Sequence, residues 1–265
     1  MVTPQELQSF IESIPPKPQI LQETLRYVEQ GELAKAANTA SQDMVLAAYL
    51  RAFVNRPQFF FQKEVKELGQ IFGILGTTGA KELLYHYMLH LFMPNKWELF
   101  ALNAQRFDEL QTMLSGYWRR IIDAEKITQP SIIAIISLLP ASIIVTEMLF
   151  ASHKKEVELL KNTKNIDYNT ILERLIGVNL FDLAKTIGQT WEMEPKSLEL
   201  LVCVSGKESC DDATLLKMAR YMHLLFFYVL SKPDYIKSGL NDFLEFMPEF
   251  VEPIYESFTK IVEQK

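Results

Sequence analysis

The sequence predicts an all-α protein in which many helices pack into a compact domain. Glycine, which all-β proteins need in their turns, occurs only ten times in 265 residues. The long segments are rich in Leu, Glu, Lys, Ala and Met, which are good helix formers. No run alternates apolar and polar residues with a period of two, which is the pattern of a half-buried strand. Together these observations favour helices throughout the chain.

The first helix is marked at both ends by its own residues. Thr3 can cap the helix, Pro4 suits the first helical position, and Glu6 completes a capping box. Residues 14–18 include three prolines, which cannot continue a helix, so we expect the helix to end there. We interpret residues 14–18 as an extended connector, although a ligand for a proline-recognition module would have a similar sequence.

Apolar residues at helical spacing recur along the rest of the chain. Residues 43–54 are apolar on most faces, which predicts a buried helix. Breaks inside the longer segments are expected at Pro140, Gly177, Pro248 and Pro253. The expected helices span residues 20–30, 32–39, 43–54, 65–75, 80–92, 97–123, 132–157, 168–190, 197–204, 213–230 and 235–262.

The glycine-rich stretch 73–79 separates two of these helices. A phosphate-binding P-loop needs Gly-Lys-Ser/Thr after a strand, whereas Lys81 comes too late and no strand precedes it. We therefore expect a loop that leads into the helix beginning at Ala80.

Charge and composition limit the partners. The formal net charge is −6 and the isoelectric point is about 5.4, so the surface repels phosphate backbones and nucleic acid is not expected as a partner. The N-terminal residues lack the basic start and apolar stretch of a signal peptide. Two cysteines, Cys203 and Cys210, do not make a disulfide framework. We therefore expect a cytoplasmic protein.

One segment, residues 132–150, is apolar and close to membrane-spanning length. It contains Glu147, which would be costly in lipid. We interpret the segment as a buried core helix, bent or broken at Pro140, and expect no membrane partner.

Several short motifs follow one another in a fixed order. They are the proline-rich residues 14–18, Asp43-Met44-Val45-Leu46 at a helix start, Val54-Asn55-Arg56, Leu75-Gly76, the apolar residues 83–92, Tyr117-Trp118 at the opening of a helix, residues 135–139, and Trp191-Glu192-Met193-Glu194-Pro195. Their order and spacing resemble those of HDOD domains, bacterial signalling modules related to HD-superfamily phosphohydrolases. Met44 and Arg56 depart from the family pattern.

The resemblance covers residues 10–205. It implies an N-terminal helical half over residues 10–94 and a degenerate HD-like half over residues 95–205, with the C-terminal helices of residues 206–265 packed on them. We expect residues 1–265 to form a single helical unit, with a seam near Pro94-Asn95.

The metal ligands of HD enzymes are missing at the positions that the resemblance indicates. Such an enzyme needs a His, a His-Asp pair and a further Asp to hold the ions that activate water. The pair would fall at Pro140-Ala141, the first His at Arg120, a later His at Leu180 and a terminal His pair at Ser205-Gly206. None of these residues supplies an imidazole or a carboxylate. The resemblance therefore implies a protein without a metal cofactor and without catalytic activity.

His86 and His90 are the sharpest local signal, because their spacing places both on one face of a helix. A metal site would need a third ligand, such as Glu82 or Glu98. The zinc-protease pattern would need Glu at position 87, where Tyr87 stands. We favour two buried or capping histidines over a metal site.

The other titratable candidates are interpreted as structural. His153 lies beside two lysines near an expected helix end, where cations complement the helix dipole. His223 lies in a strongly apolar helix and is expected to be a core histidine. Cys203 is expected to be buried, and Cys210 to be more exposed but without a basic neighbour to lower its pKa.

Two segments are candidates for contact with a partner or a ligand. Arg119 and Arg120 lie beside two aromatic residues and could bind a phosphate or carboxylate, but we favour their pairing with Asp123 or Glu125. The aromatic run Phe59, Phe60 and Phe61 follows a proline, and at least one ring is expected to pack on another element or mark an interface.

We therefore expect a cytoplasmic bacterial signal-transduction module that binds an unidentified signalling protein and is not an enzyme. One alternative is a degenerate metal-dependent phosphohydrolase with a relocated metal site at His86 and His90. Another is a sensor that binds a nucleotide or another small ligand in the vestigial HD cleft, with Arg120 in its lining. The sequence does not identify the partner or the signal.

Overall fold

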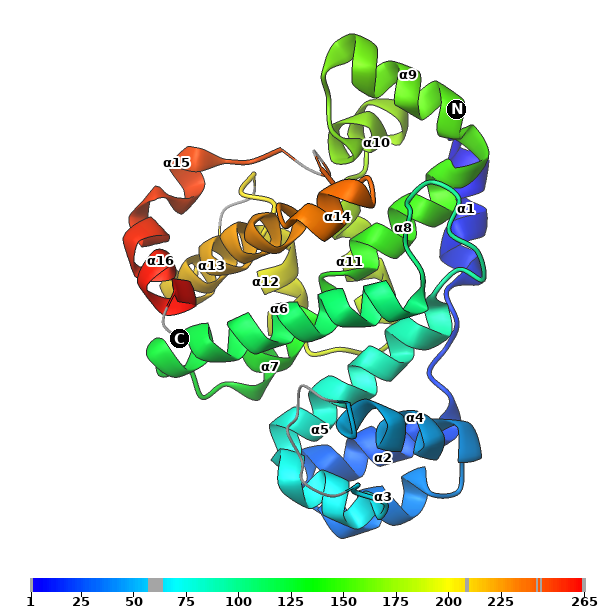
Figure 1. Ribbon diagram of the computed structural model, residues 1–265, viewed down its shortest axis with the longest axis vertical. Coiled ribbons are helices and arrows are strands. Elements are labelled where there is room, and N and C mark those ends of the chain that lie inside the picture. The colour runs from blue at the N-terminus through cyan, green and yellow to red at the C-terminus, as the bar shows by residue number, and fades with distance from the viewer. Residues whose placement is uncertain (1, 57–63, 208–209, 242, 244, 264–265) are drawn as a thin grey trace. The chain divides into compact units, whose positions relative to one another are not determined.

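The computed structural model describes residues 2–56, 64–207, 210–241, 243 and 245–263. These residues form α-helices, short 3-10 helices and irregular connections, and no β-strand occurs among them (Figure 1). The predicted all-α fold is confirmed.

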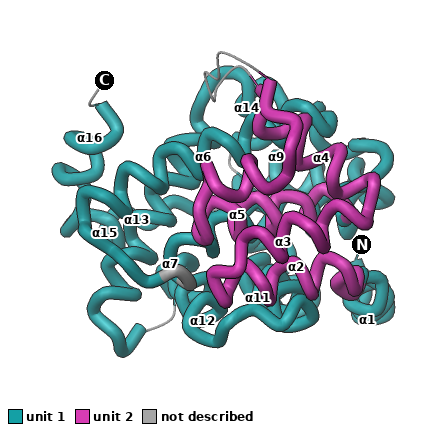
Figure 2. The backbone as a smooth tube through the Cα atoms, turned by 90° about the horizontal axis from the view of Figure 1, so that it is seen from below, with its two compact units in different colours: residues 1–15, 92–265 teal, residues 16–91 magenta. Residues whose placement is uncertain are grey.

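The chain divides into two compact units, drawn teal and magenta in Figure 2. Unit 1 contains residues 1–15 and 92–265, and unit 2 contains residues 16–91. The boundary after Leu91 lies close to the seam expected near Pro94-Asn95. That residues 1–265 act as a single unit stays a prediction.

Unit 2 begins at Pro16, within the proline-rich residues 14–18 that follow the first helix. It comprises α2 (Gln19–Glu29), α3 (Leu33–Ala40), α4 (Met44–Val54) and all but the last residue of α5 (Leu68–Phe92). Helices α2 and α3 pack against each other. Asp43 caps α4, because its carboxylate accepts hydrogen bonds from the backbone N–H groups of Val45 (2.8 Å) and Leu46 (3.0 Å). The predicted helix 43–54 is therefore confirmed with its cap.

Asn55 ties the end of α4 to the chain that leads into α5. Its amide nitrogen donates to the carbonyl of Val65 (2.8 Å), and its amide oxygen accepts from the N–H of Val65 (2.7 Å). Arg51 adds a bond from Nε to the carbonyl of Lys66 (2.8 Å). A residue of the Val54-Asn55-Arg56 motif thus has a structural role in unit 2.

The glycine-rich stretch 73–79 is helical on both sides of one kink in α5. At Gly76, φ is 64° and ψ is −174°, and a residue with a side chain rarely adopts this positive φ. The loop expected before Ala80 is therefore wrong. One glycine is enough to redirect the helix.

Unit 1 contains the remaining elements. They are α1 (Pro4–Ser13), α6 (Ala104–Ala124), α7 (Pro130–Ala134), η2 (Ile135–Leu138), α8 (Ala141–Phe150), η3 (Ala151–His153), α9 (Lys154–Lys164), α10 (Tyr168–Ile176), α11 (Leu180–Thr190), α12 (Pro195–Cys203), α13 (Ala213–Leu230), α14 (Pro233–Lys237), α15 (Pro248–Val251), η4 (Glu252–Ile254) and α16 (Tyr255–Glu263). Helix α11 packs against α8 and α12, α13 packs against α6 and α12, and α16 packs against α6. Trp118, Phe150 and Tyr221 are among the largest fully buried side chains of this core.

Most of the predicted boundaries in unit 1 are correct. Thr3 and Glu6 form the expected capping box of α1. Pro140 precedes α8, and Gly177 ends α10 with φ at 74°. The helix expected over residues 235–262 is wrong in its first half, because residues 238–241 are not helical.

Tyr117-Trp118 was expected to open a helix, but these residues lie inside α6. The ring N–H of Trp118 donates to the carbonyls of Ile132 (3.2 Å) and Ile133 (3.1 Å). These two hydrogen bonds attach α6 to α7. A tryptophan at the start of a helix would not have been expected to reach these carbonyls.

Glu147 of α8 is 1% exposed, and its carboxylate accepts hydrogen bonds from three consecutive backbone N–H groups. These groups belong to Glu98 (2.5 Å), Leu99 (2.9 Å) and Phe100 (3.0 Å). Charge-assisted hydrogen bonds of this kind compensate a buried carboxylate for its lost hydration. The helix predicted over 97–123 begins only at Ala104, where Asn103 caps it by accepting a hydrogen bond from the N–H of Arg106 (2.8 Å).

Residues 132–164 are long and apolar enough to cross a membrane by length and composition alone, and 89% of the most apolar window is buried within the fold. Such burial is typical of a core helix, which agrees with the interpretation from the sequence.

We expect Glu147→Gln to lower the free energy of unfolding by about 3 kcal/mol. The glutamine amide has only one acceptor oxygen, and its NH₂ group would face the backbone N–H donors of residues 98–100. Urea denaturation followed by circular dichroism measures the change. The control is Glu199→Gln, at an exposed carboxylate of α12, with an expected change below about 0.5 kcal/mol. Equal midpoints for the two variants would contradict this account of Glu147.

Candidate functional site

The positions where the resemblance places metal ligands are enclosed and mostly apolar. Pro140 and Ala141 are buried at the start of α8, and Leu180 is 1% exposed at the start of α11. Helices α8 and α11 pack against each other. The side chains of these three residues carry no atom that can bind a metal ion. Of the other positions, Arg120 is an exposed cation on α6, and Ser205 is buried after α12.

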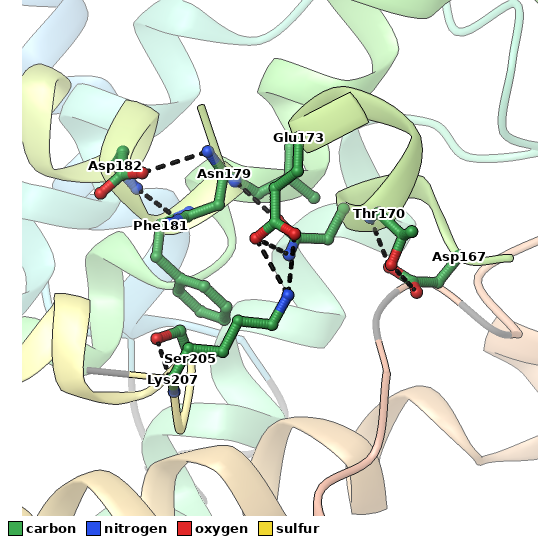
Figure 3. Close-up of polar contacts among 10 residues, drawn as sticks. Asp167, Thr170, Glu173, Asn179, Phe181, Asp182, Ser205 and Lys207 are labelled. Carbon is green, nitrogen blue, oxygen red and sulfur yellow. Dashed lines mark hydrogen bonds and ion pairs between the residues drawn. The ribbon is translucent and has the colours of Figure 1, made fainter. Parts of the chain in front are cut away.

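A polar network includes the backbone N–H of Leu180 and the side chain of Ser205. Figure 3 shows Glu173, Ser205 and Lys207 of this network. Nζ of Lys207 lies 3.0 and 2.8 Å from the two carboxylate oxygens of Glu173 on α10. Asn169 donates to Glu173 (3.2 Å) and accepts from the backbone N–H of Leu180 (2.8 Å). The hydroxyl of Ser205 accepts from the backbone N–H of Lys207 (3.2 Å). The network joins α10, the start of α11 and the segment after α12.

The carboxylates of this region are already engaged. Glu173 is in the ion pair with Lys207, and Asp182 completes a capping box with Asn179 at the start of α11. Within the part of the chain that the structure describes, no three His, Cys, Asp or Glu side chains gather in a way that could hold a metal ion. The arrangement is suited to holding helices together.

A groove of about 760 Å³ adjoins this network along α10. It is lined by Glu158, Lys161, Asn162, Asn165, Ile166, Asp167, Tyr168, Thr170, Arg174, Phe227, Gly239, Asn241, Glu245 and Phe246. Lys161 Nζ lies 3.8 Å from the centroid of the Tyr168 ring, and burial raises the pKa of Tyr168 to about 12. A second cavity, of about 450 Å³, lies between α11 and α12. Arg120, which the sequence placed in the lining of a ligand pocket, lines neither of these two cavities.

His223 is a core histidine, as predicted. It is 1% exposed, with Nδ1 2.8 Å from the carbonyl of Val204 and Nε2 accepting from the N–H of Met247 (3.3 Å). Its ring stacks on Phe227 and Phe246 at 5.4 and 6.0 Å. Burial lowers the pKa of His223, and the hydrogen bond to Val204 raises it by less. The neutral ring therefore joins α13 to two irregular segments.

His86 and His90 lie in α5 against aromatic rings of α4. The His86 ring lies edge-on to Phe53 at 5.4 Å, and the His90 ring lies 5.0 Å from Tyr49. His86 is 2% exposed. These contacts agree with two packed histidines, as favoured from the sequence.

The arginine pair lies on the exposed face of α6. The Arg120 guanidinium lies 5.6 Å from the centroid of the Tyr117 ring. Glu125, one of the two partners expected for the arginines, accepts hydrogen bonds from Lys217 and Tyr221, each at 2.5 Å. The structure adds Tyr228 and Lys232 to this surface, which the sequence analysis missed. Tyr228 lies near the end of α13 and Lys232 precedes α14, so no local spacing connects them to α6.

Phe59, Phe60 and Phe61 lie outside the described residues, so their predicted role in contacts stays a prediction.

The expected exposure of Cys210 is wrong, because this thiol is 9% exposed and Cys203 is 2% exposed. Burial raises the pKa of the Cys210 thiol, although a hydrogen bond with Cys203 opposes the shift. Neither environment favours a thiolate nucleophile.

His153 lies near a helix end, as predicted: it is the last residue of η3, three residues after α8 ends, and it precedes α9. Its Nε2 is 2.8 Å from a carboxylate oxygen of Glu6 on α1. This hydrogen bond and the bonds from Thr3 lower the pKa of Glu6 to about 2. The histidine is structural, as expected, but it acts by holding α1 to the junction of α8 and α9.

The family model of the HDOD domain matches residues 14–205. No curated protein matches the chain.

Solved structures show the same fold at low sequence identity. An HDOD domain protein of unknown function from Geobacter sulfurreducens has a TM-score of 0.66 and 14% identity, over 97% of this chain and 94% of that one. A protein from Shewanella amazonensis SB2B, provisionally named a phosphohydrolase, has a TM-score of 0.65 and 15% identity, over 97% and 94%. A provisionally named signal transduction protein from Marinobacter aquaeolei VT8 has a TM-score of 0.65 and 15% identity, but only 62% of its length is covered, against 97% of this chain.

We expect His223 to reduce stability as the pH falls below about 6.5. In the unfolded chain its pKa has the ordinary value, whereas in the folded chain it is lower. Acid therefore protonates the unfolded chain first and favours unfolding. The variant His223→Asn keeps a side-chain N–H for Val204 but does not titrate, so its stability should fall less steeply between pH 7 and 5, by up to about 1.4 kcal/mol per pH unit.

The measurement is urea denaturation at several pH values, compared with wild type. A variant with the full wild-type dependence on pH would show that His223 does not cause this part of it.

Proposed function

The chain belongs to the HDOD domain family, and on this premise we propose that it is a non-catalytic signal-transduction module of the bacterial cytoplasm that acts by binding another protein. The main support is the chemistry at the HD-like positions. Pro140, Ala141 and Leu180 stand where an HD enzyme would need metal ligands. Without a bound ion, nothing in these surroundings would lower the pKa of water enough to make a nucleophile near neutral pH.

The surroundings of those positions support the same proposal. Glu173 and Lys207 form an ion pair, and the amide oxygen of Asn169 accepts a hydrogen bond from the backbone N–H of Leu180. These groups stabilise the arrangement of α10 and α11, which preserves a helical surface. Function would then reside in contacts made by that surface, with a signalling protein as the partner.

The groove along α10 supports a second candidate, a sensor for a small ligand. Its volume of about 760 Å³ is in the range of small-molecule sites. Its lining combines the aromatic rings of Phe227 and Phe246 with the cations of Lys161 and Arg174. A ligand bound there would contact α9, α10 and α13, and could therefore influence a partner surface on the same unit.

We expect no hydrolysis of phosphomonoesters or cyclic dinucleotides above background, with or without added Mn²⁺, Fe²⁺ or Mg²⁺. An active HD phosphohydrolase assayed in parallel is the control. Turnover of about one per second or faster in the metal-supplemented protein would overturn the regulatory proposal in favour of an enzyme.

We also expect purified protein to hold less than a stoichiometric amount of any divalent transition metal. Elemental analysis after gel filtration measures this, and the variant His86→Phe/His90→Phe separates the two histidines from all other ligands. About one Mn, Fe or Zn per chain in wild type, lost in the double variant, would support the relocated metal site.

A further inference from the structure

The cavity between α11 and α12 has opposite charges on its two walls. Its volume of about 450 Å³ is in the range of small-molecule sites, and both helices belong to unit 1. The side chains that matter for binding are two charged residues, one amide and three apolar residues: Lys185, Glu199, Gln189, Met193, Leu198 and Val202. Lys185 belongs to α11 and Glu199 to α12. The cavity therefore combines one cation, one anion and an apolar surface.

The walls of the cavity are held in place by close contact between the two helices. A Cβ atom on Gly188 of α11 would lie 2.4 Å from Cδ2 of Leu198 on α12, so any other residue at this position would require Leu198 to move. The turn between the helices is a Schellman motif. In this motif the N–H of Met193 donates to the carbonyl of Gly188 (2.9 Å). The cavity is thus formed before a ligand enters, which reduces the entropy lost on binding.

The two charges are not neutralised within the described part of the chain. There, the side chains of Lys185 and Glu199 form no ion pair or hydrogen bond, either with each other or with a third residue. Asp182, one turn before Lys185, completes the capping box of α11 and accepts from the N–H of Asn179 (3.1 Å). Lys196, one turn before Glu199, is exposed and makes no ion pair with it. Both charged groups are therefore open to a ligand.

The combination of charges restricts the class of ligand. A nucleotide would bring several negative charges to a single ammonium group and would face the carboxylate of Glu199. A wholly apolar ligand would displace water from both charged groups without replacing its hydrogen bonds. A ligand with a carboxylate, an ammonium group and an apolar side chain would match all three parts of the cavity.

We propose that this cavity binds a small zwitterion with an aliphatic side chain, namely a free amino acid or a dipeptide. The ligand carboxylate accepts from Lys185, the ligand ammonium donates to Glu199, and the aliphatic side chain packs on Met193 and Val202. The inference rests on the proposed function, because it gives the sensor candidate a second site and a ligand class. Helix α11 also packs against α8, and α12 against α13, so the ligand would stabilise one arrangement of these helices.

The test measures binding to the full chain by isothermal titration calorimetry, with L-leucine and L-leucyl-L-leucine as the probes. We expect saturable binding, and the tighter of the two probes distinguishes an amino acid from a dipeptide as the source of the zwitterion. N-acetyl-L-leucine lacks the ammonium group and L-leucinamide lacks the carboxylate, so each should bind about tenfold more weakly than L-leucine. Glycine keeps both charges but has no side chain, and should also bind more weakly.

Single variants test the two polar contacts separately. Glu199→Gln should lose the preference for L-leucine over N-acetyl-L-leucine, because its amide no longer attracts the ammonium group. Lys185→Gln should lose the preference for L-leucine over L-leucinamide for the corresponding reason. Both variants should melt close to wild type, since neither side chain bonds with another described residue.

The matched control for Lys185→Gln/Glu199→Gln is Lys155→Gln/Glu249→Gln, at two exposed residues outside the cavity. Each double variant removes one positive and one negative charge, so the net charge stays at −6. The dissociation constant for L-leucine should rise about tenfold or more in the cavity variant and stay within about twofold of wild type in the control.

Absence of saturable binding of both probes up to ~10 mM would overturn the proposal. Equal affinities of the two double variants would also overturn it, because the ligand would then bind elsewhere. The same holds if wild type binds L-leucine and N-acetyl-L-leucine equally well. None of these results changes the expected absence of hydrolysis or the binding of a signalling protein, so failure of this ligand site is distinguishable from failure of the proposed function.

Discussion

Three backbone N–H groups that donate to one buried carboxylate determine the course of unit 1. Glu147 lies in an apolar helix, where an uncompensated charge would be severely destabilising, and residues 98–100 supply the compensation. Helix α6 starts after Asn103, and its Trp118 donates to the carbonyls of Ile132 and Ile133. Glu147 thus joins α8 to the segment that leads into α6, and Trp118 joins α6 to α7.

The region around positions 140, 141 and 180 is held by apolar packing and by polar contacts. Apolar residues at positions 140, 141 and 180 can be closely packed because they need no water and no ion. The polar groups that remain nearby, above all Glu173 and Lys207, use their charges on each other. Such a partly exposed ion pair contributes little stability. Its effect is to hold the segment after α12 to α10.

Aromatic rings carry much of the surface organisation of unit 1. Lys161 lies over Tyr168 in the groove, and Lys232, which precedes α14, lies over Tyr228 of α13. In both cases a ring that belongs to the core on one side holds a flexible cation on the other. Holding a lysine in this way reduces the conformational entropy that a partner would have to remove on binding. The two surfaces therefore offer charges that are already partly ordered.

Helix formation and helix ends followed from local sequence, because capping boxes, proline and glycine act within a few residues. Thr3 with Glu6, Asp43, Pro140 and Gly177 were correct for this reason. The local pattern could not reveal that the N–H groups of residues 98–100 have a partner about fifty residues away, nor that one glycine at 76 kinks a helix without a loop. The same limit applied to the sites. The sequence showed Arg120 as a charge beside aromatic residues, but it could not show that Tyr228 and Lys232 lie near it. The pairing of Glu173 with Lys207 was hidden for the same reason, because both contacts depend on which helix faces meet. Only tertiary packing decides this, because side chains far apart in sequence become neighbours through the burial of the apolar faces between them.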